Sequence, residues 1–159
     1  LAFYIKKKFM IRFTRILQEQ AAHSTTLSLP IRERTKSRIK VTLDDGREAG
    51  LFLPRGEILR GGDLVESDDG LVVQICAAPE TVSTVTSTCP HALARASYHL
   101  GNRHVPLQIE PEFLRYQHDH VLDEMIIGLG LSVAVEEAPF EPEAGAYKSA
   151  AGHNHSHHH

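Results

Sequence analysis

The sequence predicts an α+β protein of two domains, with a small all-β domain over residues 10–80 and a β-α-β-β-α-β domain over residues 81–150. Short apolar runs separated by Gly, Pro and Asp turn signals fill the first half of the chain. Helical spacing of apolar residues begins only after the β-branched run Thr81–Thr86. A length of 159 residues permits one domain of ordinary size or two small ones with modest cores, and the change of pattern favours two.

The composition is that of a folded chain without affinity for polyanions. Hydrophobic residues make up 42% and charged residues 23%, as in ordinary globular proteins. The formal charge of −3 implies no general attraction to anions, so we expect neither nucleic acid nor membrane as a partner. Only Cys76 and Cys89 occur, too few for a secreted domain stapled by disulfides, which favours the reducing cytoplasm.

The N-terminal segment places Lys6–Lys8 after an apolar start and runs directly into Met10. A secretory signal has its basic segment before an apolar stretch of about 7–15 residues, so this order is wrong for export. We expect Met10 to be the natural start and residues 1–9 to be a non-native extension. Without the three lysines, 14 basic residues face 20 acidic ones, and the formal charge of −6 suits a carrier of cations.

Alternation and turn signals predict the strands of the first domain. Ile39–Leu43 alternates apolar and polar residues, Asp44–Gly46 supplies a turn, and Ala49–Leu53 resumes the apolar pattern, which predicts a hairpin. Further Gly, Pro and Asp signals follow, and Leu71–Ala77 is an apolar run of strand length. The first half is therefore predicted to be all β.

The second domain is predicted to begin with a strand and a helix. Thr81–Thr86 is the strand, and Cys89–Pro90 opens the helix because proline is tolerated at the first helical position. Gly101–Asn102 ends the helix. Its buried face is predicted to consist of Leu93, Ala96 and Leu100.

The rest of the second domain adds three strands and a helix. Apolar residues alternate over 105–109, Phe113–Tyr116 follows a turn, helical spacing runs over 121–129, and a last strand covers 131–135. The order β-α-β-β-α-β is the pattern of a ferredoxin-like fold. Beyond it, residues 139–151 have little to bury, and a His-rich tail over residues 151–159 is expected to be disordered without metal.

Histidine is unusually frequent, at 11 of 159 residues, and the candidate metal ligands lie in three places. His104 is expected to begin a strand, and His118 and His120 lie where a strand is predicted to meet the second helix. If the segment 118–120 is extended, both imidazoles point the same way and can share one ion. The remaining candidate ligands are in the tail: His153, His155, His157, His158 and His159.

Imidazole suits nickel, copper and zinc, so an imidazole-only ligand set indicates a transition metal without naming it. The ligand must be deprotonated, so with an ordinary histidine pKa of about 6.5 metal uptake weakens below neutral pH. Two other interpretations compete with metal binding. A single H-x-H is often two surface imidazoles. A terminal histidine cluster can be a purification tag, but Asn154 and Ser156 interrupt this one, which favours a natural tail and leaves open whether residues 157–159 are artificial.

Five segments carry a resemblance to a known family. The longest is Ala94–Ile109, and the others are His118–His120, Pro139–Tyr147, Lys36–Arg47 and Leu53–Gly56. Together they make the sequence similar to the urease accessory nickel metallochaperone family over nearly all of the chain beyond the N-terminal extension. A run of sixteen contiguous residues is far more specific than a short motif.

The resemblance implies a homodimer whose ferredoxin-like domains meet, with His104 of each subunit around one shared Ni²⁺ ion. His118 and His120 match the family's additional metal-binding pair. The tail matches its terminal reservoir, although five histidines are few beside the richest members. The first domain resembles the family's peptide-binding domain. The expected partners are the urease GTPase accessory protein and the wider urease activation complex, and the expected location is the cytoplasm.

Three classes of function compete on the sequence alone. The leading one is a nickel-binding metallochaperone, not an enzyme, that delivers Ni²⁺ to urease apoprotein. A metal-dependent hydrolase needs three protein ligands and an activated water, and it lacks a convincing general base here because Asp119 has no assigned role. A general storage or buffering protein for Zn, Cu or Ni is the third class, and it would depend on the tail.

Overall fold

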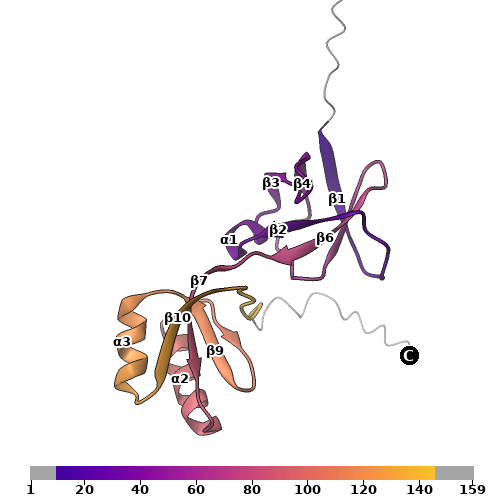
Figure 1. The fold of residues 1–159 in the computed structure, drawn as a ribbon. Coiled ribbons are helices and arrows are strands. Elements are labelled where there is room, and N and C mark those ends of the chain that lie inside the picture. Colours follow the sequence, from indigo (N-terminus) through magenta and orange to yellow (C-terminus); the bar gives the residue numbers. More distant parts are fainter. Residues whose placement is uncertain (1–9, 146–159) are drawn as a thin grey trace, which may run out of the picture. The chain divides into compact units, whose positions relative to one another are not determined.

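A computed structural model describes residues 10–145 of the chain (Figure 1). The chain separates into two compact units between Ala78 and Pro79. No helix within residues 10–145 is long and apolar enough to cross a membrane. The predicted N-terminal extension and the predicted histidine-rich tail lie outside the described residues.

The first unit is built on a sheet whose strands follow the order β2-β6-β5-β1-β4-β3. The predicted hairpin is confirmed as β3 and β4, which pair antiparallel from Arg38 opposite Phe52 to Thr42 opposite Glu48. Its turn requires a φ of 92° at Gly46, which glycine adopts without strain. The strands are β1 (Ile11–Leu17), β2 (Thr25–Leu29), β3 (Arg38–Thr42), β4 (Glu48–Phe52), β5 (Leu64–Ser67) and β6 (Val72–Ala77).

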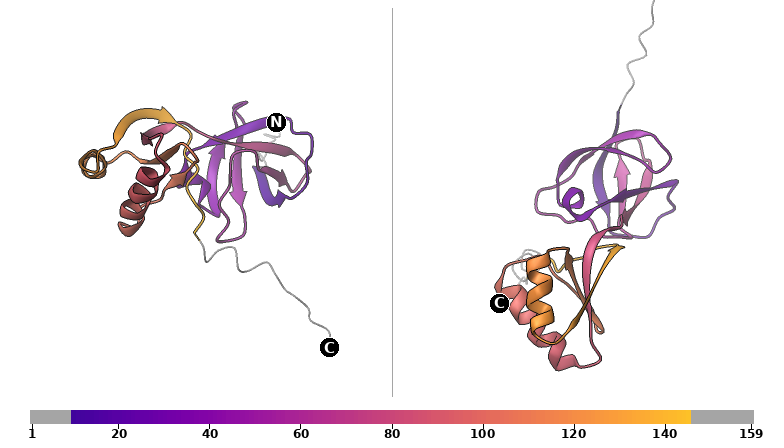
Figure 2. Two further views of the ribbon diagram at one scale, coloured as in Figure 1. Left: turned by 90° about the horizontal axis from the view of Figure 1, so that it is seen from below. Right: turned by 60° about the vertical axis from the view of Figure 1, so that its left-hand side comes forward.

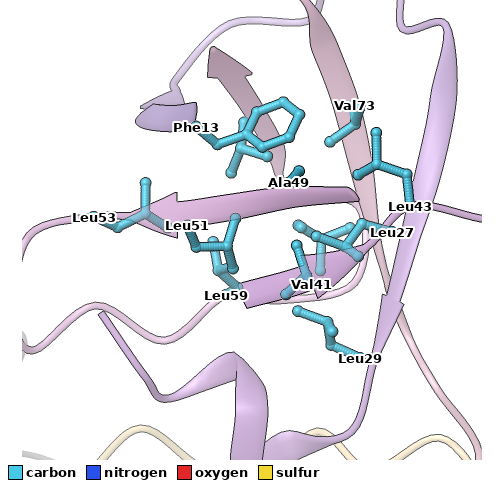
Figure 3. Close-up of a cluster of buried hydrophobic side chains, with 12 residues drawn as sticks. Phe13, Leu27, Leu29, Val41, Leu43, Ala49, Leu51, Leu53, Leu59 and Val73 are labelled. Atoms are coloured by element: carbon cyan, nitrogen blue, oxygen red, sulfur yellow. The ribbon is translucent and has the colours of Figure 1, made fainter. Parts of the chain in front are cut away.

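Apolar side chains from these strands form the core of the first unit (Figure 3). The cluster includes Phe13, Leu27 and Leu51, all of them fully buried. Because successive residues of a strand point to opposite sides of the sheet, each strand contributes alternate residues to this core. The predicted strand at the end of the first half, observed as β6, contributes Val73 and Ile75 in this way.

The first unit departs from the all-β prediction at one short element. The single-turn helix α1 (Ile31–Arg34) starts directly after Pro30. The buried Arg34 guanidinium donates hydrogen bonds of 3.0 Å to the backbone carbonyls of Leu29 and Leu59. Charged side chains are seldom fully buried unless they are paired, and these carbonyl oxygens meet that need.

The second unit contains an antiparallel sheet with the strand order β10-β7-β9-β8. Its elements follow the predicted order β-α-β-β-α-β along the chain. The first helix begins after Cys89, has Pro90 at its first position and ends at Asn102, as predicted. The elements are β7 (Glu80–Thr86), α2 (Pro90–Asn102), β8 (Gln108–Ile109), β9 (Phe113–Gln117), α3 (His120–Gly128) and β10 (Ser132–Ala138).

Helices α2 and α3 lie on the same side of this sheet and share one apolar core (Figures 1 and 2). The predicted face of α2 is confirmed, since Leu93, Ala96 and Leu100 are buried. They belong to the same cluster as Leu114 and Tyr116, which alternate with more exposed residues along β9. This packing fixes both helices against the strand that leads to the predicted histidine motif.

The apolar pattern of α3 differs from the prediction in its first turn. Leu122 and Ile126 are buried as expected, but Val121 is 49% exposed. Asp123 is buried in its place, at 9% exposure. A carboxylate on the inner side of a helix requires polar partners. For Asp123 these partners are Tyr116 on β9 and His118 of the histidine motif.

The predicted strand over residues 105–109 is wrong for most of its length. β8 contains only Gln108 and Ile109, and Ile109 is 47% exposed whereas Gln108 is buried. Leu107 is also buried, so two neighbouring residues break the expected alternation. Pro106 has no N–H to donate to a strand ladder, and pairing begins only beyond it.

The segment after β10 buries more than its composition predicts, so the expectation of little to bury was wrong. Phe140 is fully buried. The Arg115 guanidinium donates to the Pro139 carbonyl, and the Glu143 N–H donates to the Leu107 carbonyl. A Pro- and Glu-rich average composition therefore hides the buried side chains of Phe140 and Pro142.

Two adjacent residues of α3 test the packing of the second unit. Ile126→Ala should lower the free energy of unfolding by about 2–5 kcal/mol, because Ile126 is fully buried in the shared core. Ile127→Ala, at a 58% exposed position, should change it by no more than about 0.5 kcal/mol. Urea unfolding followed by the circular dichroism of the helices measures both, and equal losses would contradict the assigned face of α3.

Candidate metal centre

The predicted position of the H-x-H motif is confirmed, since β9 ends at Gln117 and α3 begins at His120. Asp119 between the two histidines is extended, with φ −150° and ψ 117°. Its carboxylate accepts hydrogen bonds from the N–H groups of Val121 at 2.8 Å and Leu122 at 3.3 Å. Asp119 is therefore the N-cap of α3, which gives it a structural role in place of the unassigned one.

The His118 ring is held on one side by protein groups. Its Nδ1 atom lies 3.1 Å from the Ser83 hydroxyl and 3.2 Å from Oδ2 of Asp123. Ser83 is fully buried on β7, and the His118 side chain keeps 37% of its surface exposed. The ring thus has one nitrogen against the protein and lies at the surface of the unit.

The carboxylate of Asp123 connects this ring to the core. Its Oδ1 atom accepts a hydrogen bond of 2.6 Å from the Tyr116 hydroxyl. Tyr116 is 1% exposed and lies directly opposite Ser83 in the β7–β9 pairing. Burial raises the pKa of the Tyr116 phenol above its ordinary value, and the hydrogen bond to Asp123 raises it further. The phenol therefore stays protonated and remains a donor to the carboxylate at neutral pH.

The arrangement of Ser83, His118 and Asp123 differs from a catalytic triad. In a triad the serine and the carboxylate contact opposite nitrogens of the imidazole, so that a proton passes through the ring. Here both partners approach Nδ1. The contacts orient the ring without activating Ser83. The nitrogen that remains available to a metal ion is Nε2.

The expectation that His104 begins a strand was wrong. Helix α2 ends at Asn102, and His104 has the left-handed φ of 56° while its N–H donates to the Gly101 carbonyl at 3.0 Å. Such a residue ends many helices and is usually glycine, and a non-glycine residue there costs on the order of 1 kcal/mol. His104 therefore lies in an exposed turn between α2 and β8.

The candidate ligands that lie within residues 10–145 are not gathered into one site by a single chain. Within residues 10–145, no group of three His, Cys, Asp or Glu side chains is placed to hold a metal ion. His104, His118 and His120 are all exposed. Their role as ligands stays a prediction, and so does that of the tail candidates outside the described residues, which are His153, His155, His157, His158 and His159.

The residues around His118 that sequence reasoning missed are Ser83, Tyr116 and Asp123. One signal for Asp123 was present, because it lies between Leu122 and Ile126 on the inner side of a predicted helix. A carboxylate at such a position needs a buried donor. The identity of the donors depends on the β7–β9 register, which the local sequence does not reveal.

Fold and site together define a two-domain α+β protein that presents an H-x-H motif at a strand–helix junction, with one of its imidazoles held by a buried carboxylate. The chain belongs to the UreE urease accessory protein family. The family profile of the N-terminal domain matches residues 12–78, and that of the C-terminal domain matches residues 80–159. These two matches leave only a short N-terminal stretch and one residue between the domains unmatched.

Individual relatives agree with this assignment. The urease accessory protein UreE of Pseudomonas putida strain W619 is 63% identical over 142 residues, which cover 89% of this chain and 88% of the relative. The protein of the same name from Citrobacter koseri is 57% identical over 152 residues, covering 94% of this chain and all of the relative. That of Tolumonas auensis is 62% identical over 148 residues, covering 90% and 79%.

The capping role of Asp119 can be separated from metal binding by two substitutions. Asp119→Ala should lower the free energy of unfolding by about 1 kcal/mol, because two N–H groups at the start of α3 lose their acceptor. Asp119→Ser keeps a capping oxygen and should retain most of the stability. Urea unfolding without metal measures both, and wild-type stability in Asp119→Ala would contradict the cap.

Proposed function

We propose that this protein binds Ni²⁺ and delivers it to urease apoprotein during assembly of the urease active site. Membership of the UreE urease accessory protein family supports a role in urease maturation. The chemistry of the candidate ligands supports nickel as the cargo, because imidazole nitrogen is a good donor for this ion. Zn²⁺ and Cu²⁺ are expected to bind the same groups, since ligand type alone does not exclude them.

The proposal is supported above all by the contacts of the His118 ring, which occupy one of its two nitrogens. Its Nδ1 is against Ser83 and Asp123, so Nε2 is the nitrogen offered to a metal. His120 follows two residues later across the extended Asp119 and is the natural second ligand. Within residues 10–145 no third ligand joins these two imidazoles, and a site with so few protein ligands is open enough for a metal to pass to another protein.

A second site is proposed at His104, in a homodimer. A two-fold axis duplicates every residue near it, so two His104 side chains can share one ion although each chain supplies only one. We interpret the second unit as a ferredoxin-like domain, which its element order and strand order support. The exposed turn that holds His104 leaves the imidazole accessible to such a partner.

Family membership supports the remaining parts of the proposal. The first unit is proposed to be the peptide-binding domain that meets partner proteins. The urease GTPase accessory protein and the urease activation complex are proposed as those partners, in the cytoplasm. The histidines of residues 151–159 are proposed to enlarge the number of nickel ions carried.

Substitution of His104 tests delivery by this protein. His104→Asn should abolish most urease activation at limiting nickel, because a dimer loses two ligands at once. Asparagine tolerates a positive φ, so the turn is preserved, whereas His104→Ala adds a backbone cost. His91→Ala, at an exposed position of α2, is the matched control and should activate normally. Substituting His118 or His120 should reduce activation less than substituting His104.

Purified urease apoprotein with its accessory proteins provides the assay, and a thermal melt of each variant excludes unfolding. Full activation by folded His104→Asn protein would overturn the delivery role of His104. A chain that lacks residues 152–159 separates delivery from storage. Retained activation with fewer bound nickel ions is expected, whereas loss of most activation would favour a general transition-metal buffer.

A further inference from the structure

Asp123 occupies a position on the inner side of α3 where helices usually carry an apolar residue. It is 9% exposed, on the inner side of α3 beside Leu122 and Ile126. A buried carboxylate is costly unless its oxygens are satisfied, and replacing a buried polar pair as a whole by apolar side chains of similar size is often neutral for stability. The packing of α3 therefore does not by itself require a carboxylate at this position, and the contacts of Asp123 indicate a second role.

Each oxygen of Asp123 faces a different donor. Oδ1 accepts the 2.6 Å hydrogen bond from Tyr116, which is anchored in the core of β9. Oδ2 lies 3.2 Å from Nδ1 of His118. The hydrogen bond from the Tyr116 hydroxyl thus fixes the orientation of the Asp123 carboxylate. That orientation directs Oδ2 to the Nδ1 atom of the His118 ring.

This geometry selects one tautomer of His118. If Nδ1 carried a lone pair, that lone pair would face a carboxylate oxygen at 3.2 Å and be repelled. With the proton on Nδ1, the carboxylate attracts it and Ser83 can accept it as well. The contact with Ser83 alone does not select a tautomer of His118, because a hydroxyl can both donate and accept a hydrogen bond.

We propose that Asp123 is a positioning residue for metal binding: held by Tyr116, it keeps the proton of His118 on Nδ1 and the lone pair of Nε2 directed to the metal. This inference rests on the proposed function, which makes His118 a ligand. A carboxylate behind a ligating imidazole fixes ring orientation and raises ligand basicity. The nitrogen that a histidine offers is set by the hydrogen bond that its other nitrogen makes.

The other two candidate ligands within residues 10–145 provide internal controls. Neither the His104 ring nor the His120 ring has a hydrogen bond or ion pair to another described residue. Both rings should therefore populate two tautomers in metal-free protein, as free imidazoles do. Of these three candidate ligands within residues 10–145, only His118 should show a single tautomer.

The test removes the carboxylate without leaving its donor unpaired. Asp123→Ala in a Tyr116→Phe background deletes both ends of the buried hydrogen bond, and Tyr116→Phe alone is the reference because it removes the anchor but retains the carboxylate as a partner for His118. Glu124→Gln removes a charge from the exposed neighbouring position and controls for net charge. Asp123→Asn keeps the shape of the side chain and should have an intermediate effect.

Two measurements on the full chain test whether Asp123 sets the tautomer of His118 and its nickel affinity. Long-range ¹H–¹⁵N correlation spectra of the metal-free protein, recorded above the ordinary histidine pKa of about 6.5, report the tautomer of each ring. Calorimetric titration with NiCl₂ reports affinity. The double variant should show mixed tautomers at His118 and bind nickel at this site about 10- to 100-fold more weakly than Tyr116→Phe.

An unchanged Nδ1–H tautomer in the folded double variant would overturn the positioning role of Asp123, and so would unchanged nickel affinity. Failure of the proposed function gives a different result. Paramagnetic broadening by Ni²⁺ should reach the His118 ring of the wild-type protein. If it does not, His118 is not a nickel ligand, and the metal-free spectra still decide whether Asp123 sets the tautomer.

Discussion

The buried carboxylate of Asp123 is the constraint on which the arrangement of the second unit's histidine motif depends. It joins the Tyr116 hydroxyl, deep under the helices, to the His118 ring at the surface. The first turn of α3 must be placed so that both contacts form at once. The Asp119 cap, four residues earlier, starts that helix at the required position. Core packing and the orientation of the His118 ring are thus set by the same turn of α3.

Where local signals agreed with each other, the fold could be predicted from the sequence. The β3–β4 hairpin followed from alternation around a turn that ends in Gly46, and α2 followed from Pro90 and one apolar face. The strand expected over residues 105–109 failed because the chain leaves α2 through a left-handed turn at His104 and then meets Pro106. Alternation of apolar residues says nothing about which backbone groups are free to pair.

The candidate site was predictable only in part. Spacing alone located His118 and His120 at a strand–helix junction, and the junction is observed. The partners of His118 could not be predicted, because Ser83 is far from it in sequence and reaches it through the pairing of β7 with β9. Buried polar contacts of this kind depend on strand register and helix phase together, neither of which a short motif contains.

We propose that His118 binds nickel through Nε2 while Asp123 retains the proton on Nδ1. A crystal structure of the nickel-loaded full chain tests it most directly. We expect nickel bonded to Nε2 of His118, with Nδ1 still beside Ser83 and Asp123 and with the Tyr116 hydrogen bond intact. Nickel bonded to Nδ1 with these contacts broken, or a folded site in which His118 touches no metal, would contradict it.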